Sequence, residues 1–266
     1  MTDQLARKRV LVTGAAQGMG REICLESARQ GAEAVIVHDV QRDGAEETAG
    51  LVREIGVPAE VVVADLRKAT EITRLIDEAV AFAGGLDTLI NNAGVIDSSF
   101  LNPSGFEALD EATWDIIMDV NLKAVWLATK AAAPHLRASD RGPSIVNSAS
   151  VAGIHGTVSA MAYGASKAGV IQLTKSCAVA LAPDIRVNAY LPGSIDTPMA
   201  QGHLSSGADR EKIARRMTGT QLMPRFGSSN EVAQVACFLA SDAASFVTGA
   251  IYAVDGGTLA WRGVQS

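Results

Sequence analysis

Short apolar runs alternate with longer amphipathic stretches along most of the chain. The apolar runs lie at residues 10–12, 34–37, 61–63, 88–90, 144–146, 186–189 and 251–254. The amphipathic stretches lie at residues 20–30, 44–55, 69–83, 114–133, 163–181 and 231–239. Short apolar runs predict strands buried on both faces, and the helical periodicity between them predicts crossover helices. We therefore expect an α/β fold, a doubly wound parallel sheet with helices on both faces.

Two stretches interrupt this alternation and are predicted to be loops. Residues 97–107 are rich in Ser, Asn, Pro and Gly. Residues 194–227 contain Pro198, Pro224 and a short helical stretch at about 209–217. Long loops in compact α/β proteins are often functional, so residues 194–227 are predicted to form a substrate lid. Because we find no linker and no repeat, we expect one domain over residues 1–266.

The composition limits the classes of function. With 48% hydrophobic and 20% charged residues, the chain can fill a large core. Its net charge of −6, without a Lys/Arg cluster, argues against nucleic acid or an anionic membrane as partner. No apolar run reaches the roughly eighteen residues that a membrane span needs.

The cysteines and histidines are few and scattered. Cys24, Cys177 and Cys237 form no CxxC pair and are expected to be small buried hydrophobes in a reducing compartment. The N-terminus leads into a short strand rather than a secretory apolar segment, so we expect a cytoplasmic location. The four histidines lack ligand spacing, so no metal is expected.

One tyrosine, one lysine and one serine are the first candidates for chemistry. Tyr163 and Lys167 are four residues apart and share one face of the predicted helix. The ammonium favours phenolate, so the pKa of Tyr163 is predicted to fall from its usual value of about 10. Ser150, thirteen residues upstream, adds a second hydroxyl. An ordinary helix pair and an ordinary serine would give the same pattern, so these residues alone leave the choice open.

A glycine-rich turn directly follows the first predicted strand. Gly14, Gly18 and Gly20 have the spacing Gly-x-x-x-Gly-x-Gly, and Gln17 and Met19 lie between them. Glycines in such a turn let the backbone approach a pyrophosphate at the N-terminus of the next helix. Because the turn lies at the first strand-to-helix junction, we interpret it as a dinucleotide site rather than a structural turn.

A carboxylate at the end of the second predicted strand favours NAD over NADP. Asp39 lies nineteen residues after Gly20, where it can bind the adenosine ribose and would repel a 2′-phosphate. Gln17 offers no cation there, although Arg42 would moderate the repulsion. We therefore predict NAD as the cofactor and NADP as the less favoured alternative.

Polar and small residues also follow the third and fourth predicted strands. Asp65 and Leu66 follow the third strand, where an adenine would be recognised. Asn92, Ala93 and Gly94 follow the fourth strand and suit a tight turn against a cofactor, although such turns are common. The predicted dinucleotide site thus extends over the ends of four strands.

Taken in order, these motifs resemble the short-chain dehydrogenase/reductase family over residues 10–257, nearly the whole chain. The matching positions are the turn at 13–20, residues 91–94, Asn121, Ser150, Tyr163 with Lys167, Pro192 with Gly193, and residues 255–257. The resemblance implies a Rossmann-like sheet with the strand order 3-2-1-4-5-6-7 and an oxidoreductase activity.

The resemblance also implies a role for each matching residue. Tyr163 would be the catalytic acid/base, and Lys167 would lower its pKa and bind the nicotinamide ribose. Ser150 would orient the carbonyl or alcohol, and Asn121 would hold a water that links Lys167 to solvent. The segment that seats the nicotinamide carboxamide would comprise Pro192, Gly193, Ile195 and Thr197.

Two residues depart from the family's pattern. Arg21 follows Gly20 where the family usually has another residue type. Tyr190 replaces a smaller residue and would either narrow the cleft or pack in the interior. The loop at 97–107 is also lengthened. None of these departures removes a catalytic group.

The predicted lid favours a neutral or weakly polar alcohol or ketone as substrate. Its apolar and adaptable candidates are Met161, Met199, His203, Leu204, Met217, Leu222 and Met223. Arg210, Arg215 and Arg216 would bind a carboxylate or form a solvated helix face, and we favour the solvated face.

The predicted helices 114–133 and 163–181 carry more apolar residues than one buried face needs. These residues include Val120, Val125, Trp126, Val170, Ile171 and Val179. The surplus predicts self-association, and the resemblance implies a homotetramer.

Three hypotheses of function remain. The first is an NAD-dependent oxidoreductase that interconverts a secondary alcohol and a ketone, with Tyr163 as acid/base. The second is an NADP-linked 3-oxoacyl-(acyl-carrier-protein) reductase, against which Asp39 and the acidic balance weigh. The third is a non-catalytic dinucleotide-binding scaffold, which the presence of Tyr163, Lys167 and Ser150 disfavours.

Overall fold

A single parallel sheet forms the centre of the protein. The computed structural model describes residues 3–102, 104–204 and 210–261, without the side chains of residues 203, 204, 210 and 216. The strands are β1 (Arg9–Thr13), β2 (Ala34–Asp39), β3 (Ala59–Val63), β4 (Thr88–Asn91), β5 (Ser144–Ser148), β6 (Arg186–Pro192) and β7 (Ile251–Val254). They pair in parallel in the order β3-β2-β1-β4-β5-β6-β7, so the predicted fold class and strand order are confirmed.

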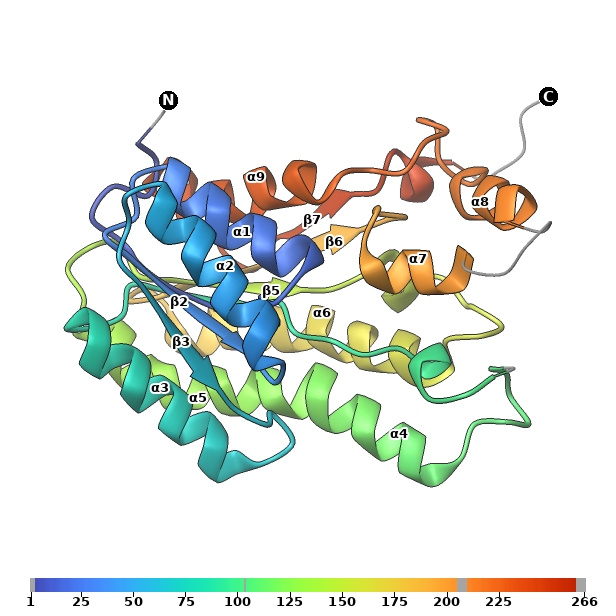
Figure 1. Ribbon diagram of the computed structural model, residues 1–266, viewed down its shortest axis with the longest axis horizontal. Coiled ribbons are helices and arrows are strands. Elements are labelled where there is room, and N and C mark those ends of the chain that lie inside the picture. The colour runs from blue at the N-terminus through green and yellow to red at the C-terminus, as the bar shows by residue number, and fades with distance from the viewer. Residues whose placement is uncertain (1–2, 103, 205–209, 262–266) are drawn as a thin grey trace.

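Helices cover both faces of this sheet (Figure 1). They include α1 (Gly18–Arg29), α2 (Arg42–Glu54), α3 (Ala69–Ala83), α5 (Ala124–Arg137), α6 (Met161–Leu181) and α9 (Ser229–Ala240). On one face α1, α2 and α9 pack around side chains such as Val12 and Val35. On the other face α3, α5 and α6 pack around side chains such as Leu11 and Ile36. Because neighbouring residues of a strand point to opposite faces, both must be apolar, which explains the continuous apolar runs.

The predicted helix at 114–133 is interrupted rather than uniform. Helix α4 (Glu111–Met118) passes through a π-helical segment at Asp119–Lys123 before α5 begins. Asp110 starts α4 by accepting a hydrogen bond from the backbone N–H of Thr113 at 2.7 Å. Hydrophobic periodicity does not distinguish a π-helical turn from an α-helical one, so the sequence predicted a single α-helix. Such turns are frequent at functional sites, and this one contains Asn121.

Two helices lie in the described part of the predicted lid. The described part of residues 194–227 includes α7 (Pro198–Leu204) and α8 (Arg210–Thr218). The helix predicted at about 209–217 corresponds to α8, whereas α7 was not foreseen. No helix among the described residues is long and apolar enough to span a membrane.

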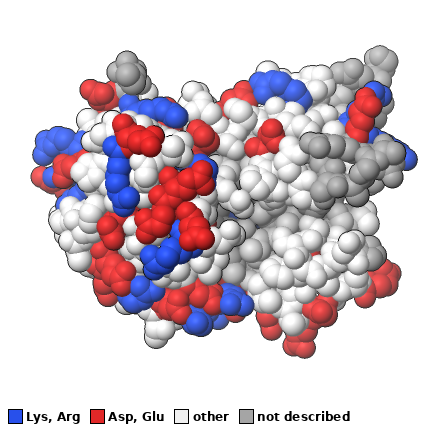
Figure 2. Space-filling model, viewed as in Figure 1, with Lys and Arg blue, Asp and Glu red and all other residues white. Residues whose placement is uncertain are grey.

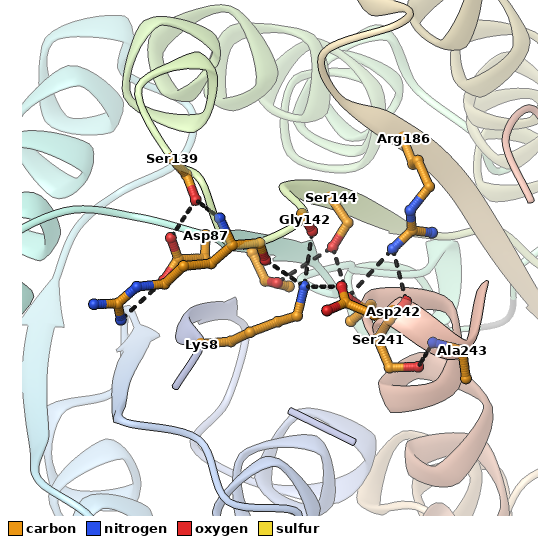
Figure 3. Close-up of polar contacts among 12 residues, drawn as sticks. Lys8, Asp87, Ser139, Gly142, Ser144, Arg186, Ser241, Asp242 and Ala243 are labelled. Carbon is orange, nitrogen blue, oxygen red and sulfur yellow. Dashed lines mark hydrogen bonds and ion pairs between the residues drawn. The ribbon is translucent and has the colours of Figure 1, made fainter. Parts of the chain in front are cut away.

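Charged side chains close the edge of the sheet where the strands begin, here called the amino edge (Figure 3). Lys8 is 2% exposed, and its Nζ donates to the carbonyl oxygens of Arg141 and Gly142 at 2.6 and 2.8 Å. It also pairs with Asp242 Oδ1 at 2.8 Å. All three donors of the ammonium group are thereby satisfied, as a buried charge requires.

A second ion pair, between Arg9 and Asp87, lies at the same edge. The Asp87 carboxylate is fully buried and accepts hydrogen bonds from Arg9 Nε and Nη2, both at 2.7 Å, and from Ser139 Oγ. Burial acts to raise the pKa of Asp87, but the bonds from Arg9 and Ser139 outweigh burial and hold this pKa below its usual value. The carboxylate therefore remains charged and connects the start of β1 to the segment before β5.

The cysteines partly meet the expectation from sequence. Cys24 and Cys237 are fully buried between α1 and α9, where burial raises the pKa of both thiols. Cys177, on α6, is only partly buried, which corrects the prediction of a buried side chain. All three thiols are free.

Candidate active site

A cleft of about 380 Å³ lies at the opposite edge of the sheet, here called the carboxyl edge, where the strands end. Parallel strands bring their terminal residues together there, which places predicted residues far apart in sequence side by side. The predicted cofactor residues in its lining are Gly14, Gln17, Gly18, Met19, Gly20, Asp39, Asp65, Leu66, Asn92, Ala93, Gly94 and Thr197. The cleft thus assembles most of the predicted dinucleotide site.

Close contacts exclude side chains from the glycine-rich turn. Gly14 has a φ of +66°, and a Cβ there would lie 2.6 Å from the Cα of Ala93. A Cβ on Gly20 would collide with the carbonyl oxygen of Gly14. Gly18 has a φ of +56°, and its open side faces Thr197 of the lid region. These positions require glycine, and they leave a bare backbone at the start of α1, which fits a pyrophosphate.

Arg21 supports this turn from outside the cleft. Its Nη2 donates to the carbonyl oxygen of Ala16 at 2.6 Å, and its Nε donates to Thr48 Oγ1 at 3.1 Å. The guanidinium also pairs with Glu47 at 2.7 Å. The departure from the family pattern therefore holds the turn against α2.

Asp39 is oriented by the backbone around it. Its Oδ2 accepts a hydrogen bond from Ala16 N and its Oδ1 one from Gln41 N, both at 3.0 Å. Each oxygen keeps further acceptor capacity on the side of the cleft. Within the described residues no Lys or Arg pairs with this carboxylate, and Arg42 pairs with Glu46 at 3.6 Å instead.

Asp65 is paired with an arginine that the sequence analysis overlooked. Arg67 Nη2 lies 2.7 Å from Asp65 Oδ2, and Arg67 Nε lies 2.9 Å from Oδ1. Hydrogen bonds from Arg67 lower the pKa of Asp65 to about 2. Both Asp65 and Arg67 line the cleft, so the residue predicted to recognise adenine presents an ion pair rather than a free carboxylate. In the sequence, the sign of this ion pair is the position of Arg67, two residues after Asp65.

Asn92 locks the ends of three strands together. Its Nδ2 donates to the carbonyl oxygens of Thr13 and Gly14 at 3.0 and 2.9 Å. Its Oδ1 accepts a hydrogen bond from the hydroxyl of Tyr190 at 2.9 Å. Tyr190 is fully buried on β6, so of the two alternatives for this residue, packing in the interior is the one the structure shows.

Ser150, Tyr163 and Lys167 converge beside the cleft. Lys167 is 3% exposed, and its Nζ lies 5.6 Å from the centroid of the Tyr163 ring. Ser150 follows β5 at the start of a short 3₁₀ turn that packs closely on α6, since a Cβ on Gly153 would lie 2.8 Å from Ala168 N. Two segments thus present two hydroxyls and an ammonium group to one place.

The acidities of this group differ from the expectation. Burial raises the pKa of Tyr163, and the hydrogen bond with Ser150 only partly opposes the rise. Burial also lowers the pKa of Lys167 to about 8. The Nζ of Lys167 donates to the carbonyl oxygen of Ser148 at 2.7 Å rather than to the phenol. The predicted lowering of the Tyr163 pKa is therefore wrong for the protein alone, because loss of hydration disfavours the phenolate.

Both polar atoms of the Asn121 side chain have hydrogen-bond partners. Its Oδ1 accepts a hydrogen bond from Val95 N at 2.8 Å. Its Nδ2 donates to Val95 O at 2.9 Å and to Ser166 Oγ at 3.1 Å. The side chain is fully buried and fixes the segment after β4 against α6. A water held by Asn121 would therefore bind its backbone or the second lone pair of Oδ1.

The predicted carboxamide segment lies between two hollows. Thr197 lines the main cleft, whereas Ile195 lines a second one beneath the lid. Gly193 packs against β7, since a Cβ there would lie 2.8 Å from the Cα of Asp255. Pro192 ends β6. Of these four residues only Thr197 lines the main cleft.

Several cleft residues were not foreseen as cofactor residues. They are His38, Val40, Gln41, Ala64, Arg67, Val95, Phe100, Ile116, Val120, Pro198 and Met199. Most are apolar residues at strand ends or on α4 and α7, and single apolar residues in loops carry no distinctive sequence signal. The side chains of residues 203–210 and 216, including predicted lid residues, lie outside the described part. Among the described residues no group of three or more His, Cys, Asp or Glu could hold a metal ion.

A parallel α/β sheet, a glycine-lined cleft and a Ser–Tyr–Lys group are together typical of oxidoreductases that bind a dinucleotide. Residues 14–258 match the family model described as enoyl-(acyl carrier protein) reductase. The chain belongs to the short-chain dehydrogenase/reductase family.

Individual relatives differ in the substrate that their names give. The 3-oxoacyl-(acyl-carrier-protein) reductase of Thermotoga maritima is 39% identical over 96% of this chain and 98% of its own. The cyclopentanol dehydrogenase of a Comamonas species is 39% identical over 94% and 96%. The ligand-free structure of Thermoplasma acidophilum aldohexose dehydrogenase has a TM-score of 0.88 and 34% identity, over 100% of this chain and 99% of that one. Membership of the family thus leaves the substrate open.

Proposed function

We propose that this protein is an NAD-dependent oxidoreductase that interconverts a secondary alcohol and a ketone. The observation that carries the proposal is the convergence of Ser150, Tyr163 and Lys167 beside a cleft lined by glycine backbone. The bare start of α1 fits the pyrophosphate of a dinucleotide. A bound nicotinamide would supply or accept the hydride.

In this mechanism Tyr163 exchanges the proton. During oxidation the phenolate takes the proton of the alcohol, and during reduction the phenol returns it to the carbonyl oxygen. Because burial raises the pKa of Tyr163, positive charge must favour its phenolate, and Lys167 supplies the nearby protein charge. Ser150 orients the substrate oxygen. Asn121 holds the segment after β4 in place through its side-chain bonds to Val95.

The choice of NAD rests on Asp39. Its carboxylate lines the cleft, and no cation of the described residues neutralises it. A 2′-phosphate at that place would face uncompensated negative charge, whereas ribose hydroxyls can donate hydrogen bonds to it. NADP therefore remains the less favoured cofactor.

An apolar entrance supports a neutral or weakly polar substrate. Phe100 and Met199 line the cleft and are 45% and 39% exposed. Ile154 and Val158, in the segment between Ser150 and Tyr163, are also exposed. Acidic and basic side chains intermingle over α1–α3, whereas the visible surface between α4 and α7 is largely uncharged and acidic side chains gather along the outer side of α4 (Figure 2). A small ring alcohol such as cyclopentanol is a suitable first substrate, as the name of one relative also suggests.

Tyr163→Phe tests the activity. We expect kcat to fall by about 10²–10⁴-fold, because the variant lacks the group that exchanges the proton. NADH affinity, measured by fluorescence, should stay nearly unchanged. Tyr252→Phe is the matched control, since Tyr252 lies half-exposed on β7. Full turnover by Tyr163→Phe in a panel of secondary alcohols and ketones would refute the proposal.

Asp39→Ala and Asp39→Asn test the cofactor. Loss of the negative charge should lower the preference for NAD over NADP, measured as the ratio of kcat/KM values, by about tenfold or more. Asp43→Asn removes the same charge from an exposed position outside the cleft and should leave the ratio unchanged. An unaltered ratio in both Asp39 variants would contradict the assignment.

A second candidate is reduction of a 3-oxoacyl group on acyl carrier protein. Its support is the relative of that name; the description of the family model names the same carrier, but an enoyl group. Faster reduction of acetoacetyl-acyl carrier protein with NADPH than of cyclopentanone with NADH would establish this alternative. The net charge of −6 disfavours it, because a carrier-binding entrance is expected to be basic.

We further propose a homotetramer, with a cytoplasmic location remaining a prediction. Val125 and Val170 are buried within the subunit, which removes them from the predicted apolar surplus. Trp126 and Val179, however, are 47% and 83% exposed on α5 and α6. Sedimentation of the wild type and of Trp126→Glu would test this, and the variant should shift toward smaller species.

A further inference from the structure

Helix α6, which carries Tyr163 and Lys167, is capped at its N-terminus by a carboxylate from another part of the chain. Asp97 lies in the loop after β4 and is 2% exposed. Its Oδ1 accepts a hydrogen bond from Ala162 N at 3.1 Å, and its Oδ2 accepts one from Tyr163 N at 3.0 Å. The N-cap residue of α6 is Ala160, which has no side chain to cap the helix. Asp97 thus satisfies two of the amides that the first turn leaves without acceptors.

The same loop is fixed to α6 at a second point. Asn121 holds Val95 through two hydrogen bonds and donates to Ser166 Oγ at 3.1 Å. Ser166 Oγ in turn donates to the carbonyl oxygen of Tyr163 at 2.7 Å. The backbone of Tyr163 is therefore held on its N–H side by Asp97 and on its carbonyl side through Ser166.

We propose that Asp97 is a positioning residue that sets the place of the Tyr163 phenol and couples it to the loop at 97–107. Tyr163 is the third residue of α6, in the turn that would fray first without a cap. A displacement of about 1 Å at a reacting group can cost on the order of 100-fold in rate. The inference rests on the proposed role of Tyr163 as acid/base.

Asp97→Asn tests this with little change in volume. The amide keeps one acceptor oxygen but turns an NH₂ group toward the second backbone N–H. We expect kcat to fall by about 10- to 100-fold while the Kd for NADH stays within about twofold. The primary isotope effect with an alcohol deuterated at the carbinol carbon should rise, because the chemical step becomes slower than product release.

Asp110→Asn is the matched control. Asp110 accepts a comparable capping bond from Thr113 N at the start of α4, on an exposed surface. It should lower the Tm without changing kcat or the isotope effect. An unchanged kcat in Asp97→Asn, or a loss that Asp110→Asn shares at equal folded fraction, would overturn the proposal.

Hydrogen exchange of the wild type provides a readout that needs neither turnover nor a folded variant. The amides of Ala162 and Tyr163 should exchange as slowly as those in the middle of α6. Exchange as fast as in an exposed loop would overturn the positioning role. Absence of any hydride transfer by the wild type would instead refute the proposed function, so the two failures are distinguishable.

Discussion

Two buried lysines at opposite edges of the sheet have contrasting surroundings. At the amino edge, Lys8 donates to two carbonyl oxygens and to Asp242, so each of its donors has a partner. At the carboxyl edge, Lys167 is equally buried but, within the described part of the chain, has one hydrogen bond, to Ser148 O. Burial accordingly lowers the pKa of Lys167 to about 8.

This difference distinguishes a lysine that stabilises the fold from one that is available for chemistry. A fully paired charge holds segments together and has no capacity left for a ligand. A buried cation with unused donors raises the free energy of the folded protein but can bind and act on another group. Loss of a partner at the amino edge is therefore expected to lower stability and spare activity, whereas loss of charge at the carboxyl edge is expected to spare stability and lower activity.

The largest stability effect is expected for Asp87→Ala. It leaves Arg9 and Ser139 without their buried acceptor and should lower the free energy of unfolding by about 3–5 kcal/mol in urea titrations. Activity per folded molecule should persist. Because the pKa of Asp87 is lowered by folding, its stabilisation is present above the usual carboxyl pKa and is lost as pH falls below about 4. The variant should therefore lose less stability on acidification, and an equal loss would contradict this account.

Lys167→Met should change the free energy of unfolding in the opposite direction. It removes a poorly compensated buried cation and should raise the free energy of unfolding at pH 7 by about 1–3 kcal/mol, while turnover is lost. The unfolded chain binds more protons than the folded one between pH 8 and 10.5, so wild-type stability contributed by this group rises across that interval. The advantage of the variant should shrink over the same range.

Lys8→Met is the control for that sign. It strands the carbonyl oxygens of Arg141 and Gly142 and should destabilise the protein by about 1–3 kcal/mol. If both Lys167→Met and Lys8→Met stabilised the protein, or if neither did, the contrast between the edges would be contradicted.

The smallest expected effect compares two serines. Ser139→Ala removes the hydrogen bond to Asp87 and should lower the free energy of unfolding by about 1 kcal/mol with activity intact. Ser150→Ala loses a capping bond from Ala152 N at 3.2 Å and the hydrogen bond with Tyr163. It should change stability by a similar amount, but it should reduce kcat strongly. Parallel thermal melts and turnover assays check both, and equal activity losses would erase the contrast.

Local patterns predicted the elements well and their irregularities poorly. The bounds of β7 and α3 agree with the predicted runs at 251–254 and 69–83. The π-helical turn around Asn121 went unpredicted because its side-chain pattern is that of an α-helix. Helix α7 went unpredicted because it is only seven residues long and begins with a proline.

The candidate site was predictable where a motif has a rigid local cause. Gly14 and Gly20 are required by backbone contacts within the turn and with its neighbouring strand, and such glycines are visible in a sequence. The Asp65–Arg67 pair and the Asp97 cap were overlooked, since short polar residues in loops are common and their partners depend on packing.

The sequence by itself determined the α/β fold, the strand order through the family resemblance, and part of the set of residues that gather at the carboxyl edge. Only the tertiary structure decided how Tyr163 and Lys167 are hydrated and held. Their acidities depend on burial, and Ser148 and Asp97, which hold them by hydrogen bonds, lie far along the chain from at least one of them. Periodicity is a local property of the chain, whereas desolvation and hydrogen bonding arise only when distant segments pack together.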